Sequence, residues 1–346
     1  MNSTSMKDIL CGIGLSVGGH VYDSLQKQSV EERTAVYAET ADDTIFQIDR
    51  DVEELIVPAL EADAASVGGI VLIAEGIEES GKPLALPRGT RPEDAAWRVL
   101  LDPIDGTRGI MYDKRSAFFL AGAAPNRGAA THLRDITTAV MVEIPTSKSL
   151  YGDLLWAICG EGAHRSRRNL LTGEMRSLPI TPSKSKPILG GFAQIARFFP
   201  PGRGLLAMIE EEMIEILFPS PPMGRAILFE DQYISTGGQL YEILVGHDRF
   251  VAELRWGLYQ FLSKAGKAPG LTCHPYDVCA HRIGLEAGIL ITGRDGNPLD
   301  APLDTVSPVD WIAYANEDIR SEVEPALQKI MCKYGLLEKY ELKNKS

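Results

Sequence analysis

Two aspartates, Asp102 and Asp105, lie close together in the sequence LLDPIDGTRGI, directly after an apolar run. Pro103 restricts the residue before it to an extended backbone and then starts a turn, which brings the two carboxylates back toward each other. Two ionised carboxylates held this close repel, and one of them would tend to take up a proton. A hard divalent cation removes that penalty, because oxygen-rich sites suit Mg²⁺. A turn in which both acids only cap local N–H groups is the structural alternative.

Gly106, which follows the second aspartate, adds a possible anion site to the same turn. Without a Cβ atom the backbone can approach a ligand closely, and N–H groups at the start of a helix can receive an anion. The turn could therefore hold a metal ion and a phosphate group together. A Ca²⁺ loop of the EF-hand type is excluded, because Ile104 and Thr107 stand where that loop needs an acid and a glycine.

Further carboxylates elsewhere in the chain could complete such a site. Glu75 ends the apolar run VLIAE, and Glu78 follows in the loop after it. Asp277 opens the predicted helix YDVCAHRIGLEAG, where an acid can also simply stabilise the helix N-terminus. Asp49 lies on an early amphipathic helix, where a solvated acid is the plainer interpretation. These two aspartates therefore have both a structural and a metal-binding interpretation.

Three familiar motifs almost occur. GIEESGKP, residues 76–83, copies a phosphate-binding P-loop until Pro83, which replaces the Ser or Thr that would hold Mg²⁺. GLSVG, residues 14–18, matches a nucleophile elbow, and the surrounding CGIGLSVGG resembles a dinucleotide fingerprint. Both of these need a preceding strand, and the residues before Gly14 are too few to build the sheet. We therefore interpret these glycines as part of a first helix.

The elements that must position the acids alternate between helices and buried strands. Helices are predicted at 7–30, 43–62, 205–218, 276–288 and 318–335. Strands are predicted at 68–76, 96–103, 116–125, 136–145 and 187–196, with a hairpin at 154–174 that has a basic tip and a mixed segment at 237–256. The Ser- and Pro-rich segment 177–187 predicts a joint between two halves, 1–180 and 181–346. Interleaved helices and strands in both halves indicate a layered α/β or α+β fold.

Composition narrows the class of protein. The 346 residues are 45% hydrophobic and carry a formal net charge of −12, which argues against a nucleic acid polymer or an anionic membrane as the partner. Five cysteines without a CxxC pair indicate reduced thiols and a cytoplasmic protein. No long apolar stretch predicts a membrane span, and no secretory signal is recognised.

Taken together, the motifs resemble the inositol monophosphatase family. DPIDGT after an apolar strand, an acid at the end of the preceding strand and YDVCAHRIGLEAG far downstream follow the family's order. DTIFQIDRDVEELI looks like the family's early helix, and GRDGNPLD is similar to its late hairpin. The resemblance covers roughly residues 40–320 and is weakest at 190–235. It implies an α+β fold of the sugar-phosphatase type, a layered αβαβα sandwich with the site between the halves, and a homodimer.

The resemblance also implies metal ligands from separate parts of the chain. These are Glu75 and the main-chain carbonyl of Ile104 at the first metal, Asp102 bridging the metals, Asp105 and Asp277 at the second, and Asp49 near a weaker third. Glu75 would also help to orient the attacking water. The cofactor implied is Mg²⁺, as two or three ions.

The phosphate-binding and catalytic residues carried over are Thr107, whose hydroxyl would position the water, and the amides of Gly106 and Thr107, which would take the phosphate. Arg108 stands where the family often has Thr or Ser, and its guanidinium could either clamp a phosphate or face solvent. Glu78 could be an additional ligand, since Gly76 occupies the place of the family's second acid. Tyr276 replaces the family's tryptophan.

The activity that the resemblance implies is hydrolysis of a small-molecule phosphate monoester by a Mg²⁺-dependent, lithium-sensitive phosphoric monoester hydrolase. The alternatives are a fructose-1,6-bisphosphatase, a 3'-phosphonucleotide phosphatase, or a non-catalytic homologue that binds a metabolite. Gly270 occupies the place of the family's inositol-contacting acid, which counts against inositol phosphate as the main substrate. The partner is a small phosphorylated metabolite, which Arg165–Arg168, Lys184 and Lys186 could attract if they do more than cover the surface.

Overall fold

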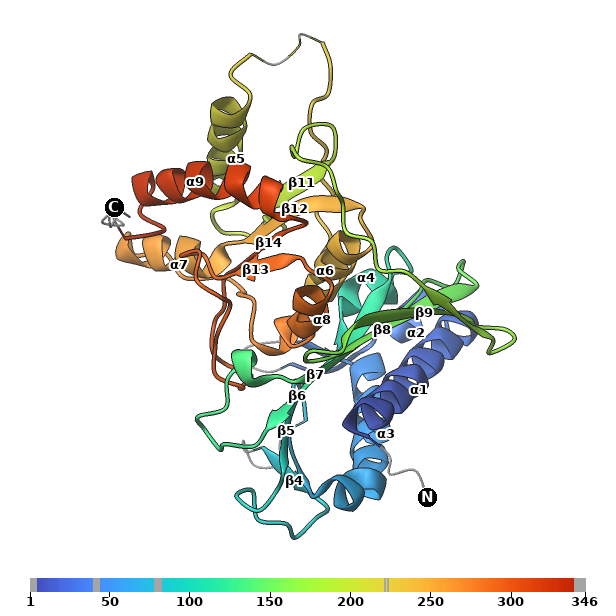
Figure 1. Ribbon diagram of the computed structural model, residues 1–346. Coiled ribbons are helices and arrows are strands. Elements are labelled where there is room, and N and C mark those ends of the chain that lie inside the picture. The colour runs from blue at the N-terminus through green and yellow to red at the C-terminus, as the bar shows by residue number, and fades with distance from the viewer. Residues whose placement is uncertain (1–4, 40–43, 78–82, 221, 223, 339–346) are drawn as a thin grey trace.

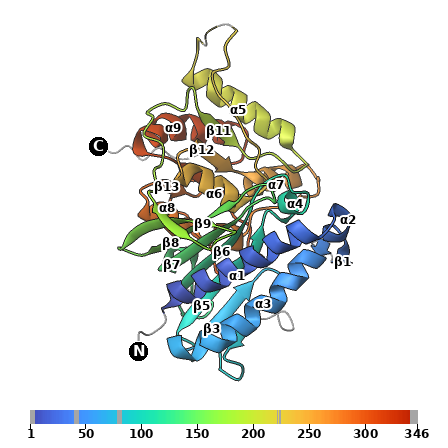
Figure 2. The same ribbon diagram turned by 90° about the vertical axis from the view of Figure 1, so that its right-hand side faces the viewer.

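A computed structural model describes residues 5–39, 44–77, 83–220, 222 and 224–338. Within these residues the chain forms two β-sheets with helices packed between them and on their outer faces, in the layer order α, β, α, β, α (Figures 1 and 2). The fold class is therefore α+β, as the sequence predicts. None of the described helices is both long enough and apolar enough to span a membrane.

The larger sheet has eight strands within the described chain. In spatial order they are β10 (Met175–Leu178), β9 (Gly162–Asn169), β8 (Tyr151–Ile158), β7 (Thr138–Ile144), β6 (Ala117–Pro125), β5 (Trp97–Asp105), β3 (Ile70–Ala74) and β4 (Leu84–Leu86). β3 and β5 pair in parallel, whereas the other neighbours pair antiparallel. The carboxyl ends of β3 and β5 therefore lie at the same edge of the sheet.

Two helices, α1 (Met6–Lys27) and α3 (Gln47–Ala64), cover the outer face of this sheet (Figure 2). The glycines of the GLSVG motif lie inside α1, so they do not form a nucleophile elbow. Close packing explains one of them, because a Cβ atom at Gly14 would lie 2.6 Å from side-chain atoms of Phe119 and Val142. The glycine lets α1 approach the sheet closely.

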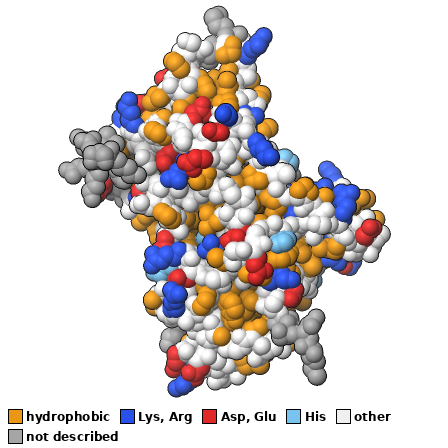
Figure 3. Space-filling model, in the orientation of Figure 1, with side chains coloured by type: hydrophobic (Ala, Val, Ile, Leu, Met, Phe, Trp, Pro, Cys, Tyr) orange, Lys and Arg blue, Asp and Glu red, His pale blue; other side chains and the backbone are white. Residues whose placement is uncertain are grey.

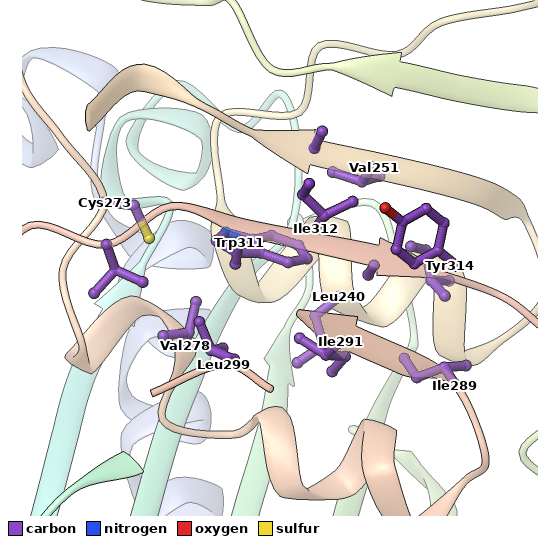
Figure 4. Packing of buried hydrophobic residues seen from close by; sticks show 14 of the residues in the cluster. Leu240, Val251, Cys273, Val278, Ile289, Ile291, Leu299, Trp311, Ile312 and Tyr314 are labelled. Carbon is purple, nitrogen blue, oxygen red and sulfur yellow. The ribbon is translucent and has the colours of Figure 1, made fainter. Parts of the chain in front are cut away.

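The smaller sheet has the strand order β11 (Phe192–Ile195), β12 (Asp248–Glu253), β14 (Trp311–Tyr314) and β13 (Leu290–Thr292). Between the two sheets lie α6 (Thr236–Leu244) and α8 (His281–Glu286), and the outer face of the smaller sheet is covered by α5 (Arg203–Leu217), α7 (Arg255–Lys264) and α9 (Glu317–Lys333). One apolar core extends from this sheet into the middle layer, with Trp311 and Ile312 on one side and Val278 and Leu299 on the other (Figure 4).

The remaining short elements are α2 (Val30–Arg33), β1 (Val36–Glu39), β2 (Thr44–Phe46), α4 (Thr107–Met111) and the 3₁₀ turns Ala65–Val67, Leu133–Asp135 and Tyr276–Val278. The first sheet ends at Leu178 and the second begins at Phe192. The division into halves at residue 180 stays a prediction. The five cysteines are all unpaired thiols, and Lys/Arg and Asp/Glu side chains are interspersed over the face shown in Figure 3.

Three predicted elements differ from the structure. The helix predicted at 43–62 begins only at Gln47, because the β-branched and aromatic residues of Thr44–Phe46 form β2 instead. The helix predicted at 276–288 is divided into a 3₁₀ turn at Tyr276–Val278 and the separate helix α8. The basic residues Arg165–Arg168 do not form a hairpin tip, since they lie within β9 and the turn before it is Cys159–Glu161.

Candidate active site

A β-bulge at the end of β5 brings Asp102 and Asp105 together. Asp102 is paired with Leu120 of β6 and Asp105 with Phe118, so β5 has one more residue than β6 between these pairs. Residues three apart on a regular strand face opposite sides, and the extra residue turns both aspartates to the same side. Asp102 Oδ1 also accepts from the backbone N–H of Ile104 over 3.1 Å, which fixes the bulge. The sequence predicted a turn here, and the structure places the turn after a bulge, at Gly106.

The parallel pairing of β3 and β5 places Glu75 beside Asp102. Ala74 is paired with Leu101, and the N–H of Glu75, the next residue, donates to the Leu101 carbonyl over 3.3 Å. The Glu75 charge is close enough to help raise the pKa of Asp102. Two acids separated by 27 positions thus become neighbours through strand register (102 − 75 = 27).

Asp277 reaches the same place from the second half of the chain. It lies in the 3₁₀ turn Tyr276–Val278, which packs against β5 and β6. Its Oδ2 accepts from the backbone N–H of His274 over 2.5 Å. One carboxylate oxygen from each of Asp102, Asp105 and Asp277 lies within 4.8 Å of the others.

The N-terminus of α6 holds Asp105 through three hydrogen bonds. Asp105 Oδ2 accepts from the Ser235 hydroxyl over 2.7 Å and from the Gly237 N–H over 2.5 Å, and Oδ1 accepts from the Thr236 N–H over 3.3 Å. Ser235 also caps α6, because its Oγ accepts from the Gly238 N–H over 2.8 Å. We did not identify these residues from sequence. A signal existed, since Ser-Thr-Gly-Gly before an apolar run is typical of a capped helix start that admits a close neighbour.

Burial and mutual repulsion raise the pKa values of these carboxyl groups in the absence of a cation. Asp102 is 1% exposed, and burial, then the charges of Glu75, Asp105 and Asp277, raises its pKa well above the usual value. Burial raises the pKa of Asp105 to about 6, against its hydrogen bonds to Ser235 and α6. Burial and the Asp105 charge raise the pKa of Asp277 to about 7.

The donor set fits a hard divalent cation. Three carboxylate oxygens converge within 4.8 Å, and a cation between them would remove both the desolvation penalty and the repulsion that raise their pKa values. The described hydrogen bonds to Asp105 and Asp277 do not neutralise their charges, because they come from neutral groups: backbone amides, the Ser235 hydroxyl and the Cys273 thiol. The residues present therefore suit a hard divalent cation better than a purely structural turn.

The turn after the bulge carries the predicted phosphate-binding residues. Gly106 adopts φ +93°, which favours glycine, and a Cβ atom there would lie 3.0 Å from Ser235 Cβ. Thr107 begins α4, and its hydroxyl donates to the Ile104 carbonyl over 2.7 Å. The Arg108 side chain is exposed on α4. The phosphate-binding roles of these residues stay predictions.

Two predicted site residues lie wholly or partly outside the parts of the chain that the structure describes. Glu78 lies outside the described residues. Asp49 lies in α3, but its side chain is not among those that the structure describes. The third metal position and the additional ligand therefore stay predictions as well.

Two arginines of the basic segment predicted to attract a polyanion form ion pairs on β9, and the attraction itself stays a prediction. Arg165 Nε and Arg167 Nε each donate to Asp153 of β8 over 2.7 Å, and the Asp153 side chain is completely buried. Tyr241 of α6 donates its hydroxyl to the same carboxylate over 2.7 Å. Two of the arginines are thus engaged in a buried ion-pair network that ties α6 to the sheet.

Comparison with known proteins identifies the fold. No protein-family model matches the sequence, and no curated protein sequence matches it either. Solved structures do match. Fructose-1,6-bisphosphatase of Leishmania major is 13% identical, with a TM-score of 0.65 over 93% of both chains.

Two further structures agree with this result. The extragenic suppressor protein SuhB of Bartonella henselae is 18% identical, with a TM-score of 0.58 over 93% of this chain and 98% of its own. An inositol monophosphatase from Anabaena (Nostoc) sp. is 15% identical, with a TM-score of 0.57 over 95% of this chain and 96% of its own. These likenesses extend over nearly the whole chain and confirm the predicted sandwich fold.

Proposed function

We propose that this protein, whose fold is that of the inositol monophosphatase and fructose-1,6-bisphosphatase structures, hydrolyses a small-molecule phosphate monoester with the help of Mg²⁺. The observation that carries the proposal is the convergence of Asp102, Asp105 and Asp277 within 4.8 Å, with the first two buried and Asp277 half-buried. A fold hosts many activities, so the function is inferred from this site and not from the likeness alone.

The residues that would hold the metal ions are Asp102, Asp105, Asp277, Glu75 and the Ile104 carbonyl. Bound Mg²⁺ would supply charge stabilisation to the phosphoryl oxygens and to the leaving group, and would favour deprotonation of the attacking water. Asp105 is held by α6 and Asp277 by the His274 amide, so these two carboxylates are oriented before a ligand binds. Such preorganisation is the main source of rate enhancement in phosphoryl transfer.

The turn beside the carboxylates would bind the substrate. The backbone N–H groups of Gly106 and Thr107 lie at the N-terminus of α4. They would donate hydrogen bonds to a phosphate oxygen. The Thr107 hydroxyl donates to the Ile104 carbonyl and keeps acceptor capacity on its oxygen, which would orient the water for in-line attack. No covalent phosphoenzyme is needed.

A panel of phosphate monoesters tests the proposed function. We expect Mg²⁺-dependent release of inorganic phosphate from at least one of inositol phosphate, fructose 1,6-bisphosphate, histidinol phosphate and 3'-phosphoadenosine 5'-phosphate. A chelator should abolish the release, and lithium should reduce it. If the protein binds these compounds but releases no phosphate from any of them, the alternative of a non-catalytic metabolite-binding protein replaces the phosphatase.

A further inference from the structure

A tyrosine hydroxyl connects two of the candidate ligands. The Tyr276 hydroxyl lies 3.2 Å from Glu75 Oε1, although the two residues are 201 positions apart. Tyr276 is the neighbour of Asp277 in the same 3₁₀ turn, and its side chain is buried. One short segment therefore supplies the Asp277 carboxylate and also contacts the acid at the end of β3.

The number of protons that each side chain can donate determines the direction of each hydrogen bond. An ionised carboxylate only accepts, so the Tyr276 hydroxyl donates its single proton to Glu75. His274 Nδ1, which lies 3.2 Å from the same hydroxyl oxygen, must then be the donor of that contact. In the neutral ring Nε2 accepts, and the Thr272 hydroxyl lies 3.4 Å from it. The chain of donors runs from Thr272 through His274 and Tyr276 to Glu75.

Stacking and backbone contacts fix the position of the hydroxyl. The rings of His274 and Tyr276 are stacked, with centroids 5.3 Å apart and planes inclined by 14°. The backbone N–H of His274 donates to Asp277 Oδ2 over 2.5 Å. Rotation of the tyrosine ring would break the stack, so the position of the hydroxyl is fixed relative to the turn that carries Asp277.

We propose that Tyr276, oriented by His274, is a positioning residue that fixes the Glu75 carboxylate beside Asp102. This inference rests on the proposed function, because Glu75 is taken as a metal ligand. A glutamate side chain loses rotational freedom when it binds a metal ion, and a hydrogen bond made beforehand reduces that loss. The aromatic ring alone cannot do this, since only the hydroxyl contacts the carboxylate.

Mn²⁺ binding to the metal-free protein tests the role without any substrate. We expect Tyr276→Phe to weaken Mn²⁺ binding by about ten-fold in calorimetric titration, as the loss of one hydrogen bond to a charged group predicts. On the best substrate, kcat should fall by about ten-fold while KM changes little. The matched control is Tyr22→Phe, which removes the bond from a buried tyrosine hydroxyl to the Ser149 carbonyl and should leave Mn²⁺ affinity unchanged.

His274 provides a second, independent test. His274→Phe keeps a flat ring but removes the Nδ1–H donor, so it should weaken Mn²⁺ binding less than Tyr276→Phe does. In the Tyr276→Phe background the same change should have no further effect, because His274 acts through the hydroxyl. The ¹⁵N shifts of His274 in the metal-free protein should show the proton on Nδ1.

Unchanged Mn²⁺ affinity in Tyr276→Phe, additive effects in the double variant, or a proton on Nε2 of His274 would each overturn the inference. None of these three measurements needs a substrate, so their outcome does not depend on whether the protein is an active phosphatase. Failure of the wild-type protein to release phosphate overturns the proposed function, while the Mn²⁺ titrations still decide whether Tyr276 positions Glu75.

Discussion

The Ser235 hydroxyl donates to Asp105 Oδ2 over 2.7 Å and joins two residues that are 130 positions apart. The Ser235 side chain therefore belongs both to the N-terminal cap of α6 and to the candidate metal site. The Ser235 oxygen accepts from the Gly238 N–H at the start of α6, and the Ser235 hydroxyl proton is donated to Asp105. A change at Ser235 is therefore expected to affect both stability and metal binding.

Ser235→Ala should lower the free energy of unfolding by about 1 kcal/mol, as loss of a helix cap does, and should also weaken Mg²⁺ binding. Chemical denaturation and calorimetric titration measure the two effects. Ser5→Ala is the matched control, because Ser5 caps α1 through a bond from the Asp8 N–H and lies on a helix that has no part in the site. Equal effects of both variants on Mg²⁺ affinity would contradict the assignment.

Asp102→Asn should reduce phosphate release by about 100-fold or more, because it removes the carboxylate expected to bridge the metals. The metal-free variant should be at least as stable as the wild type, since the substitution removes an acid whose ionised form is disfavoured in the folded protein by burial and by the neighbouring acids. Phosphate release and thermal unfolding without metal are the measurements. Asp94→Asn, at an exposed aspartate paired with Arg91, should leave both unchanged. Near-normal activity of Asp102→Asn would exclude the bridging role.

Mg²⁺ affinity should increase as the pH rises through about 6 to 7. The raised pKa values of Asp105, about 6, and Asp277, about 7, mean that these acids hold protons in the metal-free protein below those pH values. A cation must displace those protons, so its binding is weaker at low pH and releases protons there. Calorimetry in two buffers of different ionisation enthalpy measures the release. Affinity that does not change with pH would show that the cation binds elsewhere.

Asp153→Asn should lower the free energy of unfolding by about 3 to 5 kcal/mol, because it leaves the guanidinium groups of Arg165 and Arg167 without their buried partner. Denaturant unfolding gives the value. Asp135→Asn is the comparison, since its partner Arg127 is largely exposed and such a pair contributes about 1 kcal/mol or less. A similar small loss in both variants would show that the network on β9 is not stabilising.

The sequence was most informative where local pattern and chemistry agree. DPIDGT after an apolar run predicted the paired carboxylates, and the apolar runs around Glu75 and Asp102 predicted two buried strands that the structure confirms. The layered fold also follows from the alternation of helices and strands, together with the family resemblance. Local signals sufficed for these features because strand ends and turns depend on neighbouring residues in the sequence.

The remaining features depend on tertiary contacts that no local pattern encodes. The bonds from Ser235 to Asp105 and from Tyr276 to Glu75 join residues brought together only by the complete fold. The arginines of β9 were interpreted as a polar hairpin tip, because their buried partner Asp153 lies on another strand. Thr44–Phe46 continued a helical spacing, but strand pairing with β1 outweighed it.

The bulge in β5 makes the length of the DPID segment as important as its composition. Asp102 and Asp105 are three positions apart and still face the same side, because β5 has one more residue than β6 between them. Deleting either Pro103 or Ile104 would remove the bulge, and with it the local bend and twist of β5 that aim the two carboxylates. Among natural relatives, substitutions between the two aspartates should therefore be tolerated far more often than insertions or deletions there.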